Sequence, residues 1–180
     1  MSETYAALLR GINVGGNNKL PMKDLAAMFT AAGCRDVSTY IQSGNVVFSA
    51  GAALVATLPA TMSESIFARF GFRVPVVVRS ARELAGALAA NPFLASGVGP
   101  DALHVAFLAD LPSAAQLVSL DPQRSPGDAF AVLGREVYLH LPNGVARSKL
   151  TNAWLDARLL TTSTVRNWRT VQKLVEMTGG

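Results

Sequence analysis

The sequence predicts an α+β protein made of two halves, each with the element order β-α-β-β-α-β. Short apolar runs typical of strands alternate with segments in which apolar residues recur at helical spacing. Clusters of Gly, Pro, Asn and Ser separate these segments. The order of elements in the first eighty residues recurs in the remainder, although no residue-by-residue repeat aligns. Two halves packed together, residues 1–79 and 80–180, each with a split βαβ order, are therefore expected.

The first half begins with a strand over residues 5–10, which is apolar as a strand covered by helices would be. A polar loop runs to residue 20, and Pro21 opens a helix because its fixed φ suits the first turn. Gly33 is expected to end this helix. Its buried stripe comprises Met22, Leu25, Met28 and Phe29.

A hairpin and a second helix complete the first half. Strands over residues 37–41 and 46–48 flank the turn residues Gln42–Asn45. The following helix carries apolar residues at every fourth position up to Phe70, and Pro59 is expected to break it. A fourth strand is expected over residues 74–78. Because Pro75 has no N–H to donate to a neighbouring strand, it is expected either at the start of this strand or in a strand at the edge of the sheet.

The second half starts after a connecting helix, which a capping box at Ser80–Glu83 opens. Gly134-Arg135 is expected to form the turn of a hairpin. Ser148 is expected to cap the next helix and Thr164 to cap the last. The expected segments are a strand at 103–109, a short helix at 112–120, hairpin strands at 130–133 and 136–141, and a short strand at 161–163.

Composition limits the class of protein. Half of the 180 residues are hydrophobic, which favours a packed core over disorder. The formal net charge of +4 permits an acidic partner and identifies none. The one cysteine, Cys34, excludes an intramolecular disulfide and a cysteine-based zinc site. With no signal-peptide pattern and no membrane-spanning run, a cytoplasmic protein without membrane contact is expected.

Four motifs together resemble one bacterial family. They are RGINVGG at residues 10–16, the helix start at Met22–Leu25, TYIQSGNVVF at residues 39–48, and RNW at residues 166–168. In this combination the chain resembles the domain of unknown function 1697 family over nearly its whole length. The resemblance implies two ferredoxin-like halves. It implies no activity, because the family has no established reaction.

Polar runs next to the predicted strands and helices are typical of a surface that presents amides and cations to an anionic ligand. The loop before Pro21 fails the Walker A pattern, because Asn17 stands where the lysine is needed. Its glycines also fit a purely conformational role. Arg10 either binds a ligand or pairs with Asp24 or Asp36. The candidate ligand-binding residues are Arg10, Asn13, Gly15, Gly16, Lys19, Gln42, Asn45, Arg147, Ser148, Lys149, Arg166 and Asn167.

No residue set predicts a reaction. Cys34 has no neighbouring histidine, and His104 and His140 lie in predicted strands without a third ligand, so no metal site is expected. Arg166, Arg169 and Lys173 are expected on the exposed face of the last helix.

The residues leave three functions open, and the catalytic groups and cofactors unknown. The first is a module that binds a phosphate-bearing ligand, either a nucleotide or a nucleic acid. The second is an enzyme on a small phosphorylated or amide-bearing substrate. The third is a scaffold or homo-oligomer in which the polar motifs are purely structural clasps. Whatever its function, the chain is expected to be a monomer or a homodimer.

Overall fold

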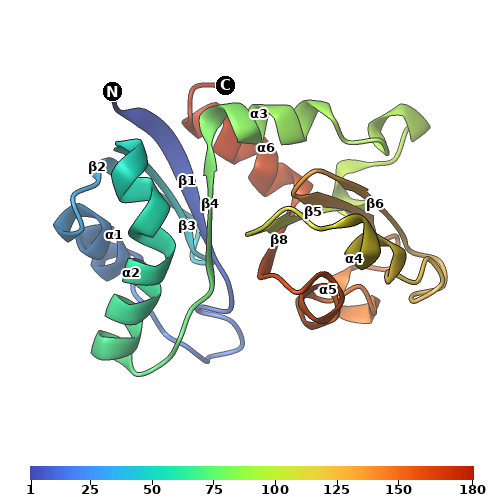
Figure 1. The fold of residues 1–180 in the computed structure, drawn as a ribbon, viewed down its shortest axis with the longest axis horizontal. Helices are drawn as coiled ribbons and strands as arrows, with labels where there is room; N and C mark the ends of the chain where they lie inside the picture. The colour runs from blue at the N-terminus through green and yellow to red at the C-terminus, as the bar shows by residue number, and fades with distance from the viewer. The chain divides into compact units, whose positions relative to one another are not determined.

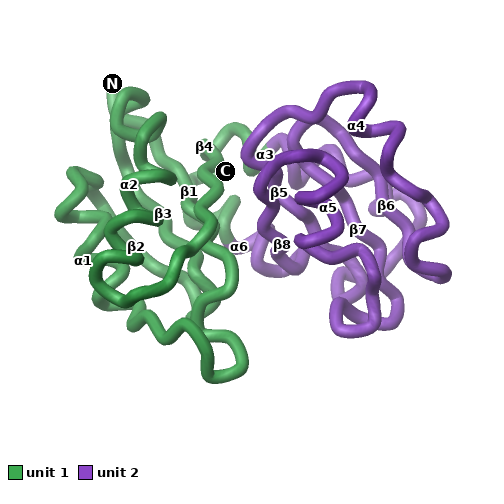
Figure 2. Tube along the Cα trace, turned by 60° about the horizontal axis from the view of Figure 1, so that its bottom comes forward, with its two compact units in different colours: residues 1–85, 174–180 green, residues 86–173 purple.

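The computed structural model describes all residues, 1–180, and the chain forms two compact units (Figure 2). Unit 1 comprises Met1–Ala85 and Leu174–Gly180, and unit 2 comprises Gly86–Lys173. The chain passes between the units inside two helices, α3 (Ala81–Ala89) and α6 (Trp168–Met177). No helix has both the length and the apolar character needed to cross a membrane.

Each unit contains one four-stranded antiparallel sheet and has the element order β-α-β-β-α-β, which confirms the predicted α+β fold class (Figure 1). The architecture is consistent with two ferredoxin-like halves. The elements of unit 1 are β1 (Glu3–Leu9), α1 (Met22–Ala31), β2 (Arg35–Tyr40), β3 (Asn45–Ala50), α2 (Ala52–Phe70) and β4 (Val76–Ser80). Those of unit 2 are β5 (Leu103–Leu108), α4 (Ala114–Val118), β6 (Ala129–Leu133), β7 (Glu136–His140), α5 (Asn152–Leu159) and β8 (Ser163–Asn167). The strand orders are β2-β3-β1-β4 and β6-β7-β5-β8.

The core of unit 1 lies between its sheet and the helices α1 and α2, which cover one face of that sheet (Figure 1). Alternate residues of β1 and β3 point into this core, as the period-two geometry of a strand requires. The helical stripe predicted from spacing is confirmed at Leu25, Phe29, Leu58, Met62 and Ile66, which are all buried.

The break predicted at Pro59 is wrong, because α2 runs continuously from Ala52 to Phe70 with Pro59 inside it. An interior proline costs a helix about 3 kcal/mol. The buried side chains of Leu58, Met62 and Ile66 each contribute about 1.5–3 kcal/mol when they leave water. Their packing on the sheet therefore outweighs the proline and keeps the helix whole.

The core of unit 2 lies between its sheet and α5, with Trp154, Leu155 and Leu159 packed on strands β5 and β7. The predicted cap Ser148 is wrong: Thr151 precedes α5, and its side chain accepts the Trp154 N–H at 3.2 Å. Ser148 Oγ instead accepts the Leu150 N–H two residues on, at 3.0 Å. The Ser148 hydroxyl thus accepts a hydrogen bond within a local turn instead of one from the first turn of a helix.

The last helix also begins later than the sequence predicts. Residues 163–167 form β8, which pairs with β5 from Ser163 to Asn167. Helix α6 begins at Trp168, and Asn167 Oδ1 accepts the Thr170 N–H at 2.8 Å. Asn167, rather than Thr164, therefore supplies the N-cap interaction.

The structure reveals a short internal repeat at the last strand of each sheet. Val78-Arg79-Ser80-Ala81-Arg82 spans the end of β4 and the start of α3, and Val165-Arg166-Asn167-Trp168-Arg169 spans β8 and α6. Each first arginine is the fourth residue of a five-residue strand and is buried, with 1% and 7% of its surface exposed. Each donates from Nη1 to the carbonyl of the preceding valine, at 3.1 and 2.9 Å. The next residue of each segment caps the following helix.

His104 is a buried titratable residue of unit 2, and its burial predicts a pH-dependent stability. It lies in β5 with 8% of its surface exposed, and its Nδ1 has no hydrogen-bond partner. Burial lowers the pKa of His104 below its usual value of 6.5, while a hydrogen bond to the backbone of Ala102 opposes this shift. Below pH 6.5 the unfolded chain therefore binds a proton that the folded chain resists, and stability falls as the pH drops.

We expect the His104→Leu variant to lose part of this dependence. Thermal midpoints are measured from about pH 5 to about pH 7.5. As the pH drops below about 6.5, the midpoint should fall less steeply for the variant than for the parent. Carboxylates titrate alike in both proteins, so the difference between the two curves isolates His104. Parallel curves would show that His104 does not resist protonation in the folded state.

Candidate functional site

The loop between β1 and α1 is held in shape by the side-chain amide of Asn13. Its Nδ2 donates to the carbonyl oxygens of Leu20 at 2.8 Å and Gln42 at 2.9 Å, and its Oδ1 accepts the Leu20 N–H at 2.8 Å. Asn13 itself has a φ of 54°, a conformation that asparagine tolerates better than most residues. This one side chain therefore ties the loop to the helix start and to the β2–β3 turn.

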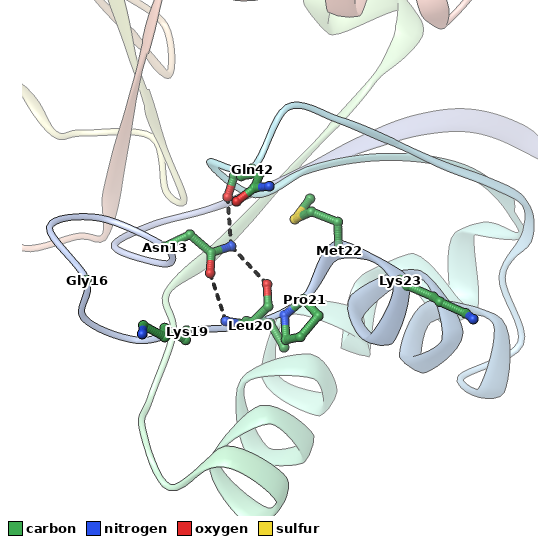
Figure 3. A pocket seen from close by; sticks show the side chains of 8 residues that line it. All are labelled: Asn13, Gly16, Lys19, Leu20, Pro21, Met22, Lys23 and Gln42. Atoms are coloured by element: carbon green, nitrogen blue, oxygen red, sulfur yellow. Dashed lines mark hydrogen bonds between the residues drawn. The ribbon is translucent and has the colours of Figure 1, made fainter.

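A pocket of about 520 Å³ opens beside this clasp, at the N-terminal end of α1 (Figure 3). Its wall is built by three segments: the glycine-rich loop, the first residues of the helix, and the β2–β3 turn. Four of the candidate residues line it. The lining residues are Asn13, Gly16, Lys19, Leu20, Pro21, Met22, Lys23 and Gln42.

The start of α1 leaves backbone donors unused at this pocket. The first helical bond is donated by Leu25 N to the Pro21 carbonyl at 3.0 Å, and no side chain caps the helix. The N–H groups of Met22, Lys23 and Asp24 consequently have no acceptor within the chain, as is usual for an uncapped first turn. The positive end of the helix dipole lies at the same place.

The charges lining this pocket are all positive. Lys19 and Lys23 are exposed and form no ion pair, and Figure 3 shows them on either side of Pro21 with their ammonium groups directed apart. The nearby carboxylate, Asp24, lies 3.4 Å from Arg69. The side chain of Gln42 is exposed and makes no hydrogen bond, so its amide is available as a donor or an acceptor. The arrangement fits an anion that accepts several hydrogen bonds.

The other first-half candidates lie outside this lining. Asn45 is fully buried, and its Nδ2 donates to the Tyr40 carbonyl at 3.1 Å and to Ser43 Oγ at 3.2 Å, which makes it part of the hairpin turn. Arg10 follows β1, and its backbone N–H donates to the Pro75 carbonyl at 3.0 Å. Gly15 is exposed in the loop with a φ of 58°.

In unit 2 the candidates are spread over the two sides of the sheet. Ser148 and Lys149 precede α5, and the Lys149 N–H donates to Ser125 Oγ at 3.0 Å, while Arg147 is exposed beside them. Val165 packs in the core under α5, so its neighbour Arg166 points to the opposite face of the sheet. Asn167 caps α6. The unit 2 candidates therefore do not converge on one site.

The prediction that Arg166 is exposed on a helix is wrong. It lies in β8 and donates from Nη1 to Thr164 Oγ1 at 2.8 Å and to the Val165 carbonyl at 2.9 Å. Burial lowers the pKa of Arg166 to about 10, so the guanidinium still carries its charge at neutral pH. A charged group held this deeply is part of the structural framework of unit 2.

Comparison with known proteins identifies the family. The model of a protein family of unknown function, DUF1697, matches residues 2–138. The chain belongs to the DUF1697 family. The solved structure of the conserved bacterial protein SP0830 from Streptococcus pneumoniae is similar to this DUF1697 chain, with a TM-score of 0.72 and 24% identity, and the alignment covers 99% of each chain. At this identity the likeness supports the fold alone. No curated protein matches the chain.

Two features of this DUF1697 chain were not predicted from its sequence. Lys23 lines the pocket, and its position two residues after Pro21 is the signal that could have indicated this. Arg79 is buried in β4, and the repeated Val-Arg-x-x-Arg pattern marks it as the counterpart of Arg166. Cys34 is buried, and burial raises the pKa of its thiol, which disfavours the reactive thiolate.

Proposed function

We propose that this DUF1697 chain is a cytoplasmic binding module for a small phosphate-bearing ligand such as a nucleotide, held at the pocket beside the start of α1. The observation that carries the proposal is the combination of three unbonded backbone N–H groups with Lys19 and Lys23 around one cavity. A phosphate group accepts several hydrogen bonds at once and carries the opposite charge.

The size of the pocket favours a small molecule over an extended polyanion. A cavity of about 520 Å³ lies within the range of about 300–1,000 Å³ that is usual for small-molecule sites. Two lysines on one pocket also differ from the long basic stripe by which proteins follow a nucleic-acid backbone. The ligand class supported best is therefore a phosphate ester, with its phosphate at the helix start and its remaining part along Gln42 and Met22.

The experiment removes the two lysines and compares the loss of affinity with that caused by removing two exposed arginines of unit 2. We expect Lys19→Ala/Lys23→Ala to weaken binding of ATP or inorganic phosphate at least about tenfold, because hydrogen bonds to charged groups each contribute about 1.5–3 kcal/mol. The matched control, Arg124→Ala/Arg158→Ala, lowers the net charge equally at exposed positions outside the pocket. Backbone amide shifts of Met22, Lys23 and Asp24, followed by NMR during titration, report contact directly.

Each possible result of this titration supports or excludes one mode of binding. Shifts confined to residues 13–24 and 42, lost in the lysine variant and kept in the control, support the proposal. Equal weakening in both variants would show unspecific charge attraction. An oligonucleotide that binds while ATP and phosphate do not, with a log–log salt slope near −0.9 for each phosphate contact, would favour nucleic acid instead. No shift with any of the three probes would overturn the binding function.

A further inference from the structure

The edge strand β6 of the unit 2 sheet differs in sequence and regularity from the other three edge strands, β2, β4 and β8. The strand β6, residues Ala129–Leu133, has the sequence AFAVL, with no charge, no proline and no irregularity of register. The edge strand β2 carries Arg35 and Asp36 and shifts its register between Arg35 and Ser38. The edge strands β4 and β8 each contain one of the buried arginines. Charges and bulges protect a sheet edge from pairing with another chain, and β6 lacks both.

The free backbone groups of β6 follow from its register with β7. Leu133 and Glu136 flank the two-residue turn and form a hydrogen-bonded pair, and bonded and non-bonded pairs alternate from there. The N–H and C=O groups of Phe130 and Val132 therefore point away from β7. No residue of the chain bonds to them, and residues 129–132 are each partly exposed, with Leu133 47% exposed.

We propose that β6 pairs antiparallel with β6 of a second copy of this chain, about a twofold axis at Ala131, to join two unit 2 sheets. This register places Phe130 opposite Val132 of the partner and forms about four backbone hydrogen bonds, the largest number that the strand allows. It also sets each exposed Leu133 against the small Ala129 of the other copy. An apolar strand of this length thus complements itself.

The charges at the ends of the strand support the same register. Asp128 precedes β6, and Gly134-Arg135 follows it. In the antiparallel pair each Asp128 comes opposite Gly134 of the second copy, so that at each end an acidic residue of one copy lies one position from a basic residue of the other. Within each copy Asp128 Oδ2 accepts the Ser125 O–H at 2.6 Å, and Arg135 Nη1 donates to the Ala109 carbonyl at 3.3 Å. A parallel pairing would instead align like charges. The placement of the charges at the strand ends therefore favours the antiparallel direction for a second copy, independently of the proposed ligand pocket.

The test uses the one residue that would face itself across the axis. Directly opposite side chains in such a pair lie with Cβ atoms about 4.5–5.5 Å apart, where like charges repel. We expect the parent mass, measured by sedimentation from about 5 µM to about 500 µM, to rise toward twice that of the chain. Ala131→Lys and Ala131→Glu should each stay monomeric, and a mixture of the two should regain the doubled mass.

Controls separate this edge from general surface stickiness and from misfolding. Val118 is 85% exposed in unit 2 and lies outside β6, so Val118→Lys should associate as the parent does. Unchanged circular dichroism of the Ala131 variants would show that the chain as a whole keeps its secondary structure. A parent that remains monomeric over the whole range, an Ala131→Lys variant that still associates, or a mixture that fails to recover would each overturn the proposal.

Discussion

Replacing Gly44 with alanine is expected to cost about 2–4 kcal/mol of stability. Gly44 lies in the β2–β3 turn with a φ of 89°, which an L side chain rarely adopts. A Cβ there would lie 2.8 Å from Leu9 Cβ and 3.0 Å from Ile12 Cδ1, and both of those residues are fully buried. The Leu9 atom is fixed by the backbone of β1, so the turn has to move.

The matched variant Gly71→Ala separates the backbone strain from the steric clash. Gly71 has a similar φ of 81° at the end of α2, and a Cβ there meets nothing within 4 Å. Gly71→Ala should therefore lower the free energy of unfolding by about 1 kcal/mol, the ordinary cost of a left-handed conformation for a residue with a side chain. Chemical denaturation of both variants measures the two values. Equal losses would mean that Leu9 and Ile12 accommodate the extra methyl group.

Arg166→Ala is expected to destabilise unit 2 by about 3 kcal/mol or more. The substitution removes a large buried side chain and takes the donor from Thr164 Oγ1, which is buried, and from the Val165 carbonyl, which is partly buried. Arg79→Ala should behave alike, because Arg79 occupies the same place in β4 and is still more buried. Thermal and denaturant unfolding provide the measurement.

The neighbouring Arg169 supplies the control for this prediction. It lies in the first turn of α6, is largely exposed, and pairs with Asp101 at 2.9 Å on the surface. Exposed ion pairs of this kind add little to stability, so Arg169→Ala should unfold as the parent does. If Arg166→Ala also unfolded like the parent, the buried guanidinium would contribute no more than a surface charge.

The sequence predicts most of the fold because the periodic segments are long or well delimited. Leu58, Met62 and Ile66 recur at a fixed helical spacing, and the Ser80–Glu83 capping box forms as expected, with the Glu83 N–H donating to Ser80 Oγ at 3.2 Å. The sequence predicts helix for residues of the last strand, because Val165 and Trp168 also fit helical spacing over so short a segment. Its pairing with β5, a long-range contact, decides the outcome.

The candidate site was predictable only in part. Gly16 and Lys19 line the pocket, and the sequence indicates both because backbone N–H groups and cations before a helix start favour anions. The sequence could not show that the Asn13 amide is committed to three backbone partners, nor that Asn45 turns inward. The amide groups of Asn and Gln use the same atoms to form hydrogen bonds within turns and to bind ligands. Only the three-dimensional contacts show which of the two a given amide does.

Unit 1 is completed by residues that are synthesised after the whole of unit 2. Unit 1 contains the first residues and also Leu174–Gly180, where Thr178 lines a groove together with Glu3 and Ser80. Unit 2 is one continuous stretch, so all of its residues leave the ribosome before the segment that completes unit 1. Multidomain chains usually finish their N-terminal domain first. Here the N-terminal unit is completed last. Until Leu174–Gly180 are synthesised, the part of unit 1 around Glu3 and Ser80 lacks these residues.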